Sequence, residues 1–266
     1  MERERLTITL RKDVLKLVDQ SIDGAKLRNR SHAIEYFLSL ELAPKSVKVV
    51  LAVPGGGMRQ SYQAGGMSIG IRDSFTETNG SNIRAIFRIL AEQNFKEVLL
   101  AGADSTSLEA AAVDGERMGL NVRTEAVEPN SISSQLLEYV KNETFIYWDA
   151  RAALELNLPD LLEVHKSGQG PGTAVLATSP ASGSPIGLFG HVYGRKITAV
   201  GGEELKPLGA LPLAGLAVFE SEAVLTDKQF RISGVLAELA RTGNLNGFVM
   251  TLNEMAKQTA VSRTAR

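Results

Sequence analysis

From residue 47 onward, short apolar runs alternate with segments of helical periodicity, and this alternation constrains the fold more than any other feature. The run Val47–Val53 is almost wholly apolar, which is typical of a strand covered on both faces. Strands that alternate with helices form βαβ units, so we expect an α/β domain with a mostly parallel sheet. Further strands are expected within 96–103, 121–127 and 144–150, and helices within 82–94, 105–118 and 133–142.

The first 42 residues follow a different pattern. Residues 5–10 alternate strictly between polar and apolar side chains, and a period of two predicts a half-buried strand. Two helical patterns follow, within 11–24 and 30–42, and Asn29 is a good N-cap for the second. Pro44 cannot continue that helix, so a domain boundary is expected there.

The two predicted domains span residues 1–44 and 47–266. A domain of about 40 residues usually cannot bury its apolar face alone, and a lone strand leaves both of its edges unpaired. Two chains that pair their strands antiparallel and interlock their helices remove both problems. We therefore expect a homodimer, with further assembly into a tetramer as an alternative.

The polar face of the first predicted strand suits DNA. A paired ribbon displays Arg5, Thr7 and Thr9 twice, and such a ribbon fits the major groove, where Arg reads guanine and Thr contacts base edges. The positive N-terminal end of the second helix suits a backbone phosphate. The residues at that end are Arg28, Asn29, Arg30 and Ser31. The alternative is a dimerisation segment, or a strand added to the sheet of the larger domain.

Residues 3–42 resemble the ribbon-helix-helix family of DNA-binding dimers (CopG/Arc/MetJ type). The resemblance rests on the strand RLTITL, the helix pattern VLKLVDQSI and the helix start NRSHAI. It implies base contacts from the strand residues Arg5, Thr7 and Thr9, and phosphate contacts from Asn29–Ser31. The implied partner is a double-stranded DNA operator.

Two features of the larger domain have more than one interpretation. Gly55–Gly57 directly follows the first apolar strand, where backbone N–H groups can approach an anion. Tight turns after a strand also need glycine for steric reasons. Asp149, at the end of a buried run, either binds a metal ion or caps the next helix.

The order of motifs over 47–250 resembles the sugar-nucleotide (NTP) transferases, which join a nucleoside triphosphate to a sugar phosphate. The motifs are VKVVLAVPGGGMR, KEVLLAGAD, FIYWDA, HKSGQGPGTAVLAT and PLAGLAVFESEAV. The resemblance implies a Rossmann-like α/β nucleotidyltransferase domain with Asp149 as a magnesium ligand. The nucleotide-binding residues that it implies are Gly55, Gly56, Gly57, Arg59 and Arg72.

This sequence departs from that family at several catalytic positions. Arg72 stands where the family has lysine, and Trp148 where it has glycine. Residues 204–207, Glu-Leu-Lys-Pro, contain one residue more than the sugar-contacting Glu-Lys-Pro of the family. The second magnesium-binding aspartate of the family is missing near 251–253. These departures favour a domain that has lost catalysis, so Mg²⁺ is expected only if the site is active.

The composition excludes several other classes. The chain is 44% hydrophobic and 22% charged, as in ordinary soluble domains. It has no cysteine, which excludes disulfides, thiolate zinc sites and cysteine nucleophiles. No apolar stretch approaches the ~18 residues of a membrane span, and the N-terminus does not resemble a signal peptide. We expect a cytoplasmic, nucleoid-associated protein.

Three functions remain open. The first is a sequence-specific transcriptional regulator whose transferase-like domain senses a nucleotide or nucleotide-sugar effector, or serves oligomerisation. The second is an active sugar-phosphate nucleotidyltransferase whose DNA-binding head regulates its own genes. The third is an assembly protein that coats DNA. An intact DNA-binding face beside an altered catalytic set favours the first.

Arg5→Ala is expected to weaken specific DNA binding by about 1–3 kcal/mol, because the contact to a guanine is lost. Titration of a duplex selected with the wild-type protein, and of its scrambled version, measures this loss. Unchanged sequence-selective binding by the variant would exclude the base-reading role.

Overall fold

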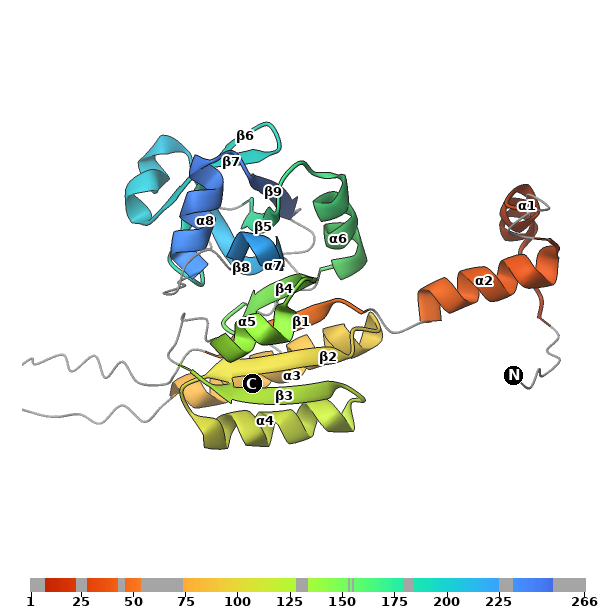
Figure 1. Ribbon diagram of the computed structural model, residues 1–266, viewed down its shortest axis with the longest axis horizontal. Coiled ribbons are helices and arrows are strands. Elements are labelled where there is room, and N and C mark those ends of the chain that lie inside the picture. The colour runs from red at the N-terminus through yellow and green to blue at the C-terminus, as the bar shows by residue number, and fades with distance from the viewer. Residues whose placement is uncertain are drawn as a thin grey trace, which may run out of the picture. The chain divides into compact units, whose positions relative to one another are not determined.

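The computed structural model describes residues 8–22, 28–42, 46–53, 74–127, 134–152, 154, 156–178, 184–224 and 232–250. The chain divides into two compact units, Met1–Lys45 and Ser46–Arg266. Figure 1 labels their helices and strands. None of the described helices is long and apolar enough to cross a membrane.

The small unit contains the two expected helices, α1 (Lys12–Gln20) and α2 (Arg30–Leu42). Asn29 caps α2, because its Oδ1 accepts a hydrogen bond from the backbone N–H of His32 at 2.9 Å. The helices meet at a small core in which Val18 and Ala33 are buried. The two predicted helices and the predicted cap are therefore confirmed.

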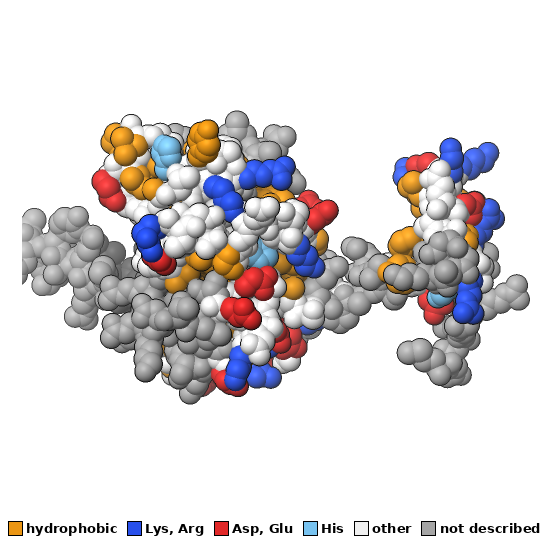
Figure 2. Space-filling view, turned by 45° about the horizontal axis from the view of Figure 1, so that its top comes forward, with side chains coloured by type: hydrophobic (Ala, Val, Ile, Leu, Met, Phe, Trp, Pro, Cys, Tyr) orange, Lys and Arg blue, Asp and Glu red, His pale blue; other side chains and the backbone are white. Residues whose placement is uncertain are grey.

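The small unit leaves much of its apolar surface uncovered. Ile8 is 53% exposed, Leu17 65% and Leu38 50%, and Figure 2 shows hydrophobic side chains among Lys and Arg on this unit. Ile8, Thr9 and Leu10 lie in neither a helix nor a strand of the single chain. A strand needs a paired neighbour, which the expected dimer would supply. The two-stranded ribbon of that dimer therefore stays a prediction.

The described part of the large unit contains one nine-stranded sheet with the order β3-β2-β1-β4-β8-β5-β9-β7-β6. The strands are β1 (Lys48–Val53), β2 (Glu97–Gly102), β3 (Asn121–Ala126), β4 (Thr144–Asp149), β5 (Gly172–Ala177), β6 (Phe189–Tyr193), β7 (Lys196–Gly201), β8 (Leu211–Glu220) and β9 (Leu245–Met250).

The predicted parallel sheet is confirmed for β3-β2-β1-β4. Beyond β4 the sheet is mixed: β8 runs antiparallel between β4 and β5, and β7 runs antiparallel to β6 and β9. Apolar runs alone do not give strand direction, so the sequence pattern did not predict the reversed β8.

Helices cover both faces of the sheet. They are α3 (Ser74–Glu92), α4 (Ser105–Arg117), α5 (Ser134–Val140), α6 (Leu158–Ser167), α7 (Ser221–Val224) and α8 (Ile232–Arg241), with the 3₁₀ helix η2 (Glu203–Leu208). Residues of α3, α4 and α6 pack into one core, and residues of α5 and α8 into the core on the opposite face (Figure 1). The helix expected from Asn82 begins earlier, at Ser74. The sequence pattern did not predict this start, because Phe75 is the only apolar side chain in residues 74–81 and gives no apolar period.

Alternate residues of β1 enter the two cores. Val49 and Leu51 belong to the core under α3, whereas Val50 belongs to the core under α5 and α8. All three are fully buried. Burial on both faces explains why this strand is an almost continuous apolar run.

A polar cluster joins α6 to the sheet, with His165 and Thr173 buried and the Glu220 side chain partly exposed. His165 Nδ1 lies 2.9 Å from Thr173 Oγ1, and His165 Nε2 lies 3.1 Å from Glu220 Oε1. Thr144 Oγ1 also donates to the carboxylate of Glu220, at 2.9 Å. The imidazole therefore ties the helix to β5 and β8.

Thr173→Val is expected to lower the free energy of unfolding by about 1–3 kcal/mol, because it leaves a buried ring nitrogen of His165 without its partner. Denaturant unfolding measures the change. Thr198→Val is the matched control, since it removes an exposed hydroxyl from β7 and should change stability by less than about 0.5 kcal/mol. Equal losses in the two variants would contradict a structural role of the buried hydroxyl.

Candidate functional site

The strand order of the sheet reverses beside β1. The strands β1, β2 and β3 follow one another outward on one side, and the chain then crosses back to place β4 on the other side of β1. In open α/β sheets, ligands bind beyond the carboxyl ends of the strands at such a reversal. The candidate site is therefore the edge at which β1 ends at Val53 and β4 ends at Asp149.

At this edge Asp149 forms an ion pair with Arg151. Asp149 Oδ1 accepts hydrogen bonds from Arg151 Nε at 2.8 Å and from the Arg151 backbone N–H at 3.0 Å. Asp149 Oδ2 accepts from Arg151 Nη2 at 2.7 Å. The side chain of Asp149 is 1% exposed and that of Arg151 is 30% exposed. The pair thus connects a buried carboxylate to a guanidinium that reaches solvent.

This pairing favours an anion-binding role for Arg151. Hydrogen bonding to Asp149 raises the pKa of the Arg151 guanidinium, so the group stays charged. Asp149 uses only two of the five guanidinium N–H donors, which leaves donors for a phosphate oxygen. A bidentate carboxylate also fixes the plane of the guanidinium.

The same pairing bears on magnesium. Both oxygens of Asp149 accept hydrogen bonds from Arg151, and the described residues contain no group of three His, Asp or Glu side chains able to hold a metal ion. Mg²⁺ prefers one or two free carboxylates together with substrate phosphates. In this arrangement a Mg²⁺ ion would have to share the Asp149 carboxylate with Arg151 or displace it. The role of Asp149 as a metal ligand stays a prediction.

Strand β8 approaches the Asp149 pair through Gly215. This residue has a φ of +80°, a region that L side chains rarely adopt. A Cβ at this position would lie 3.3 Å from Asp149 Cβ and 3.2 Å from Ala152 Cβ. Both the backbone conformation and the close contact favour glycine here.

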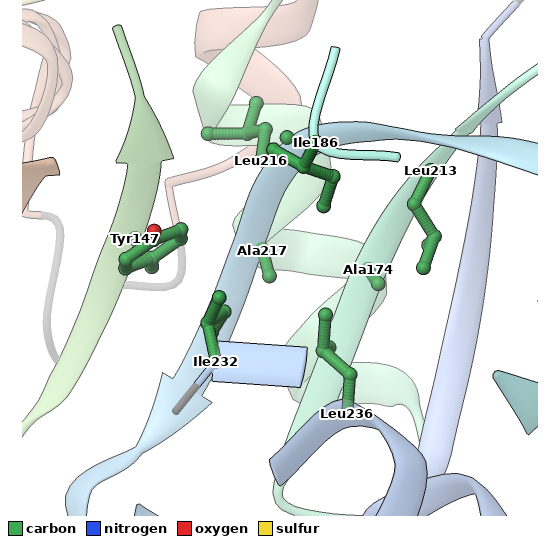
Figure 3. A pocket seen from close by; sticks show the side chains of 9 residues that line it. Tyr147, Ala174, Ile186, Leu213, Leu216, Ala217, Ile232 and Leu236 are labelled. Carbon is green, nitrogen blue, oxygen red and sulfur yellow. The ribbon is translucent and has the colours of Figure 1, made fainter. Parts of the chain in front are cut away.

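A small apolar pocket lies beside Gly215, where β4, β5 and β8 face α8 (Figure 3). Its cavity measures about 10 Å³, roughly the space of one water molecule. Its lining residues are Tyr147, Ala174, Ile186, Leu213, Gly215, Leu216, Ala217, Ile232 and Leu236. The Tyr147 hydroxyl is buried without a hydrogen-bond partner among the described residues, and burial raises its pKa, so it stays protonated.

The candidate DNA-contacting residues of the small unit gather at the start of α2. Arg28, Asn29, Arg30 and Ser31 are all exposed there, as is Thr9 before α1. Arg30 is engaged by Asp19, whose carboxylate accepts from Nε at 2.6 Å and from Nη2 at 2.7 Å. This hydrogen bonding raises the pKa of Arg30 and lowers that of Asp19. A phosphate at this helix end would have to share Arg30 with Asp19.

Other predicted site residues fall elsewhere. Trp148 is fully buried and its Nε1 donates to the backbone oxygen of Ala152 at 2.5 Å, so it belongs to the core. On η2, Lys206 pairs with Glu203 and lies 4.7 Å from the ring centre of Phe189. Outside the described residues lie Arg5, Thr7, Gly55, Gly56, Gly57, Arg59 and Arg72.

Sequence reasoning missed Arg151, Tyr147 and Gly215. The spacing of two between Tyr147 and Asp149 does place them on one face of a strand. A glycine inside the apolar run of β8 is also a signal, since glycine in a strand often marks a close approach of another segment. Nothing in the local pattern indicated that Arg151 turns back onto Asp149.

Comparison with known proteins shows a likeness of fold alone. No protein-family model and no curated protein matches the sequence. Among solved structures, a Bacillus anthracis protein assigned as a glucose-1-phosphate thymidylyltransferase, in complex with a sucrose, superposes with a TM-score of 0.62 at 12% identity, over 82% of this chain and 95% of that chain. The inositol-1-phosphate CTP transferase from T. maritima gives a TM-score of 0.55 at 12% identity, over 77% of this chain and 86% of that chain.

These likenesses show a shared fold. The chain contains a mixed α/β fold similar to that of nucleotidyltransferases. This confirms the expected α/β class of the large unit, whereas the sheet as a whole is mixed and not mostly parallel as expected. The likenesses do not bear on the ribbon-helix-helix interpretation of the small unit, which stays a prediction.

Arg151→Ala and Asp149→Asn are expected to differ in their effect on stability. Arg151→Ala leaves a buried carboxylate without its cation and should cost about 3 kcal/mol, whereas Asp149→Asn leaves a guanidinium that water can reach and should cost about 1 kcal/mol. Denaturant unfolding tests this order. Arg241→Ala, which breaks an exposed pair with Glu238, is the control and should behave as wild type. A larger loss of unfolding free energy for Asp149→Asn than for Arg151→Ala would contradict the pairing.

Proposed function

We propose that the large unit is a sugar-phosphate nucleotidyltransferase whose substrates bind at the edge where β1 and β4 end. The observation that carries this proposal is the Asp149–Arg151 pair at the reversal of strand order, in a fold shared with transferases named for glucose 1-phosphate and inositol 1-phosphate. The two names have a phosphate ester of a cyclic polyol in common.

The proposed reaction transfers a nucleotidyl group. An oxygen of the polyol phosphate attacks the α-phosphorus of a nucleoside triphosphate, the bond from that phosphorus to the bridging oxygen of the β-phosphate breaks, and pyrophosphate leaves. Both substrates are anionic, so catalysis depends on positive charge at the phosphates. Arg151, held by Asp149, supplies such a charge with donors to spare.

In this proposal the small unit is a ribbon-helix-helix head that dimerises, binds a double-stranded DNA operator and regulates the enzyme's own genes. Three features support it: a capped helix start at α2 with Arg28 and Arg30 exposed, a core too small to cover the helices, and exposed apolar side chains such as Leu17 and Leu38. A dimer would cover that apolar surface.

A second function is favoured by one specific observation. Because Arg151 engages both oxygens of Asp149, the large unit could bind a nucleotide or nucleotide sugar without reacting. The protein would then be a transcriptional regulator with an effector-sensing domain. Binding and turnover therefore have to be measured separately.

The full chain is incubated with each nucleoside triphosphate, Mg²⁺, and glucose 1-phosphate or inositol 1-phosphate, and pyrophosphate release is followed. We expect release that requires both substrates, and a loss of about 100-fold in rate for Arg151→Ala, because a charge aimed at the phosphates is removed. Arg241→Ala is the control, since its guanidinium pairs with exposed Glu238.

Thermal unfolding with the same compounds separates the two candidates. A ligand at about 100 times its dissociation constant stabilises the folded state by about 2.7 kcal/mol. Stabilisation without pyrophosphate release would favour the effector-sensing regulator. If the compounds neither stabilise the folded state nor lead to pyrophosphate release, both candidate functions are contradicted.

A further inference from the structure

We infer that Trp148, assisted by Asn82, is a positioning residue for Arg151, because it holds in place the turn that carries the phosphate-binding guanidinium. The turn runs from Asp149 to Ala152. In this inference neither Trp148 nor Asn82 contacts the ligand, since each acts through a backbone carbonyl of the turn. The inference rests on the proposed function, in which Arg151 binds a substrate phosphate, and adds how that arginine is kept in place.

The first argument is that hydrogen bonds close the turn along its length. The Ala152 backbone N–H donates to the Asp149 carbonyl at 2.9 Å, and the Arg151 backbone N–H donates to Asp149 Oδ1 at 3.0 Å. The Ala150 N–H donates to the carbonyl of Ala52 in β1, at 2.9 Å. Ala150 and Ala152 are buried, so Arg151 is the residue of this turn whose side chain reaches solvent.

The second argument is the hydrogen bond that Trp148 makes across this turn. Trp148 Nε1 donates to the carbonyl of Ala152 at 2.5 Å, which joins the residue before the turn to the last residue of the turn. The indole is fully buried in the core under α3, so packing fixes its position. A buried N–H needs an acceptor, and the Ala152 carbonyl supplies it. Because Arg151 lies between the two joined residues, an outward movement of its backbone would break this bond.

The third argument is that the turn is held from both faces of the sheet. Side chains alternate along β4, so Trp148 and Asp149 point to opposite faces. On the α3 side, where Trp148 lies, Asn82 Nδ2 also donates to the Arg151 carbonyl, at 3.4 Å. On the other side Asp149 holds the guanidinium through Nε and Nη2. The backbone and the side chain of Arg151 are thus held by separate groups.

A fixed turn favours phosphate binding because a cation that is already ordered loses little freedom when the anion arrives. A guanidinium on a loose turn would have to be ordered by the ligand, and the affinity would fall by that cost. We therefore expect that removing the hydrogen bond of Trp148 or of Asn82 weakens phosphate binding, although Arg151 itself is unchanged.

The test uses the full chain as wild type, Trp148→Phe and Asn82→Leu, with Gln93→Leu as the matched control. Trp148→Phe keeps an aromatic ring in the core without the N–H donor, and Asn82→Leu removes a donor at similar volume. Gln93, which directly follows α3, donates to the carbonyl of Leu156 at 2.7 Å and accepts from the Leu158 N–H at 2.7 Å. It holds a segment beyond the turn, so its loss affects stability without loosening the turn.

Calorimetry measures the binding of inorganic pyrophosphate to each protein. Trp148→Phe and Asn82→Leu should each weaken it about 3–10-fold, the size of one lost hydrogen bond, whereas Gln93→Leu should bind as wild type does. Without ligand, the Arg151 Nε–H signal of the ¹⁵N-labelled chain, identified by its loss in Arg151→Ala, should exchange slowly with water because Asp149 accepts it. It should exchange faster in the two turn variants and at the wild-type rate in the control.

Three outcomes would overturn the inference. In the first, Trp148→Phe and Asn82→Leu bind pyrophosphate as wild type does, which would leave Trp148 a core residue only. In the second, Gln93→Leu loses as much affinity, which would assign the losses to general destabilisation. In both cases wild type still binds, so the proposed function stands. In the third, wild type itself binds no pyrophosphate, and the proposed function then fails together with the inference. Asn82→Leu alone decides the question if Trp148→Phe does not fold.

Discussion

The large unit depends on the burial of β4 between β1 and β8. Its residues from Phe145 to Trp148 are almost fully buried and serve the cores on both faces. On one side β4 pairs parallel with β1, and on the other it pairs antiparallel with β8. Because side chains alternate between faces, fixing the register of β4 also fixes Tyr147 and Asp149 on one face. The pocket and the ion pair both follow from that register.

The reversed strand β8 brings the parts of the site together. Its glycine at position 215 allows close contact with Asp149 and Ala152, and its alanine at 217 forms part of the pocket wall. A parallel strand in the same place would need a long crossover connection. The mixed half of the sheet is thus a part of the candidate site as well as of the scaffold.

The Asp149–Arg151 pair has two opposing consequences. A carboxylate with 1% exposure is costly without a cation, so the pair stabilises the end of β4 and fixes the plane of the guanidinium. It also occupies the oxygens that a magnesium ion would use. In the proposed function, the balance between anion binding and metal binding distinguishes an active transferase from an effector sensor. The small unit has a different constraint, since with Val18 and Ala33 as its buried core it leaves Leu17 and Leu38 exposed.

Local patterns in the sequence determined most of the secondary structure. The apolar run at Val47–Val53 predicted a doubly covered strand, and Asn29 predicted the start of α2, because periodicity and capping depend on neighbouring residues. The start of α3 at Ser74 was missed because its first two turns carry a single apolar side chain, Phe75, and so no apolar period. The direction of β8, the contact of Gly215 with Asp149 and the burial of the Tyr147 hydroxyl were decided by the tertiary structure. These features join residues more than 60 positions apart or depend on what packs over them, and no local period encodes such contacts.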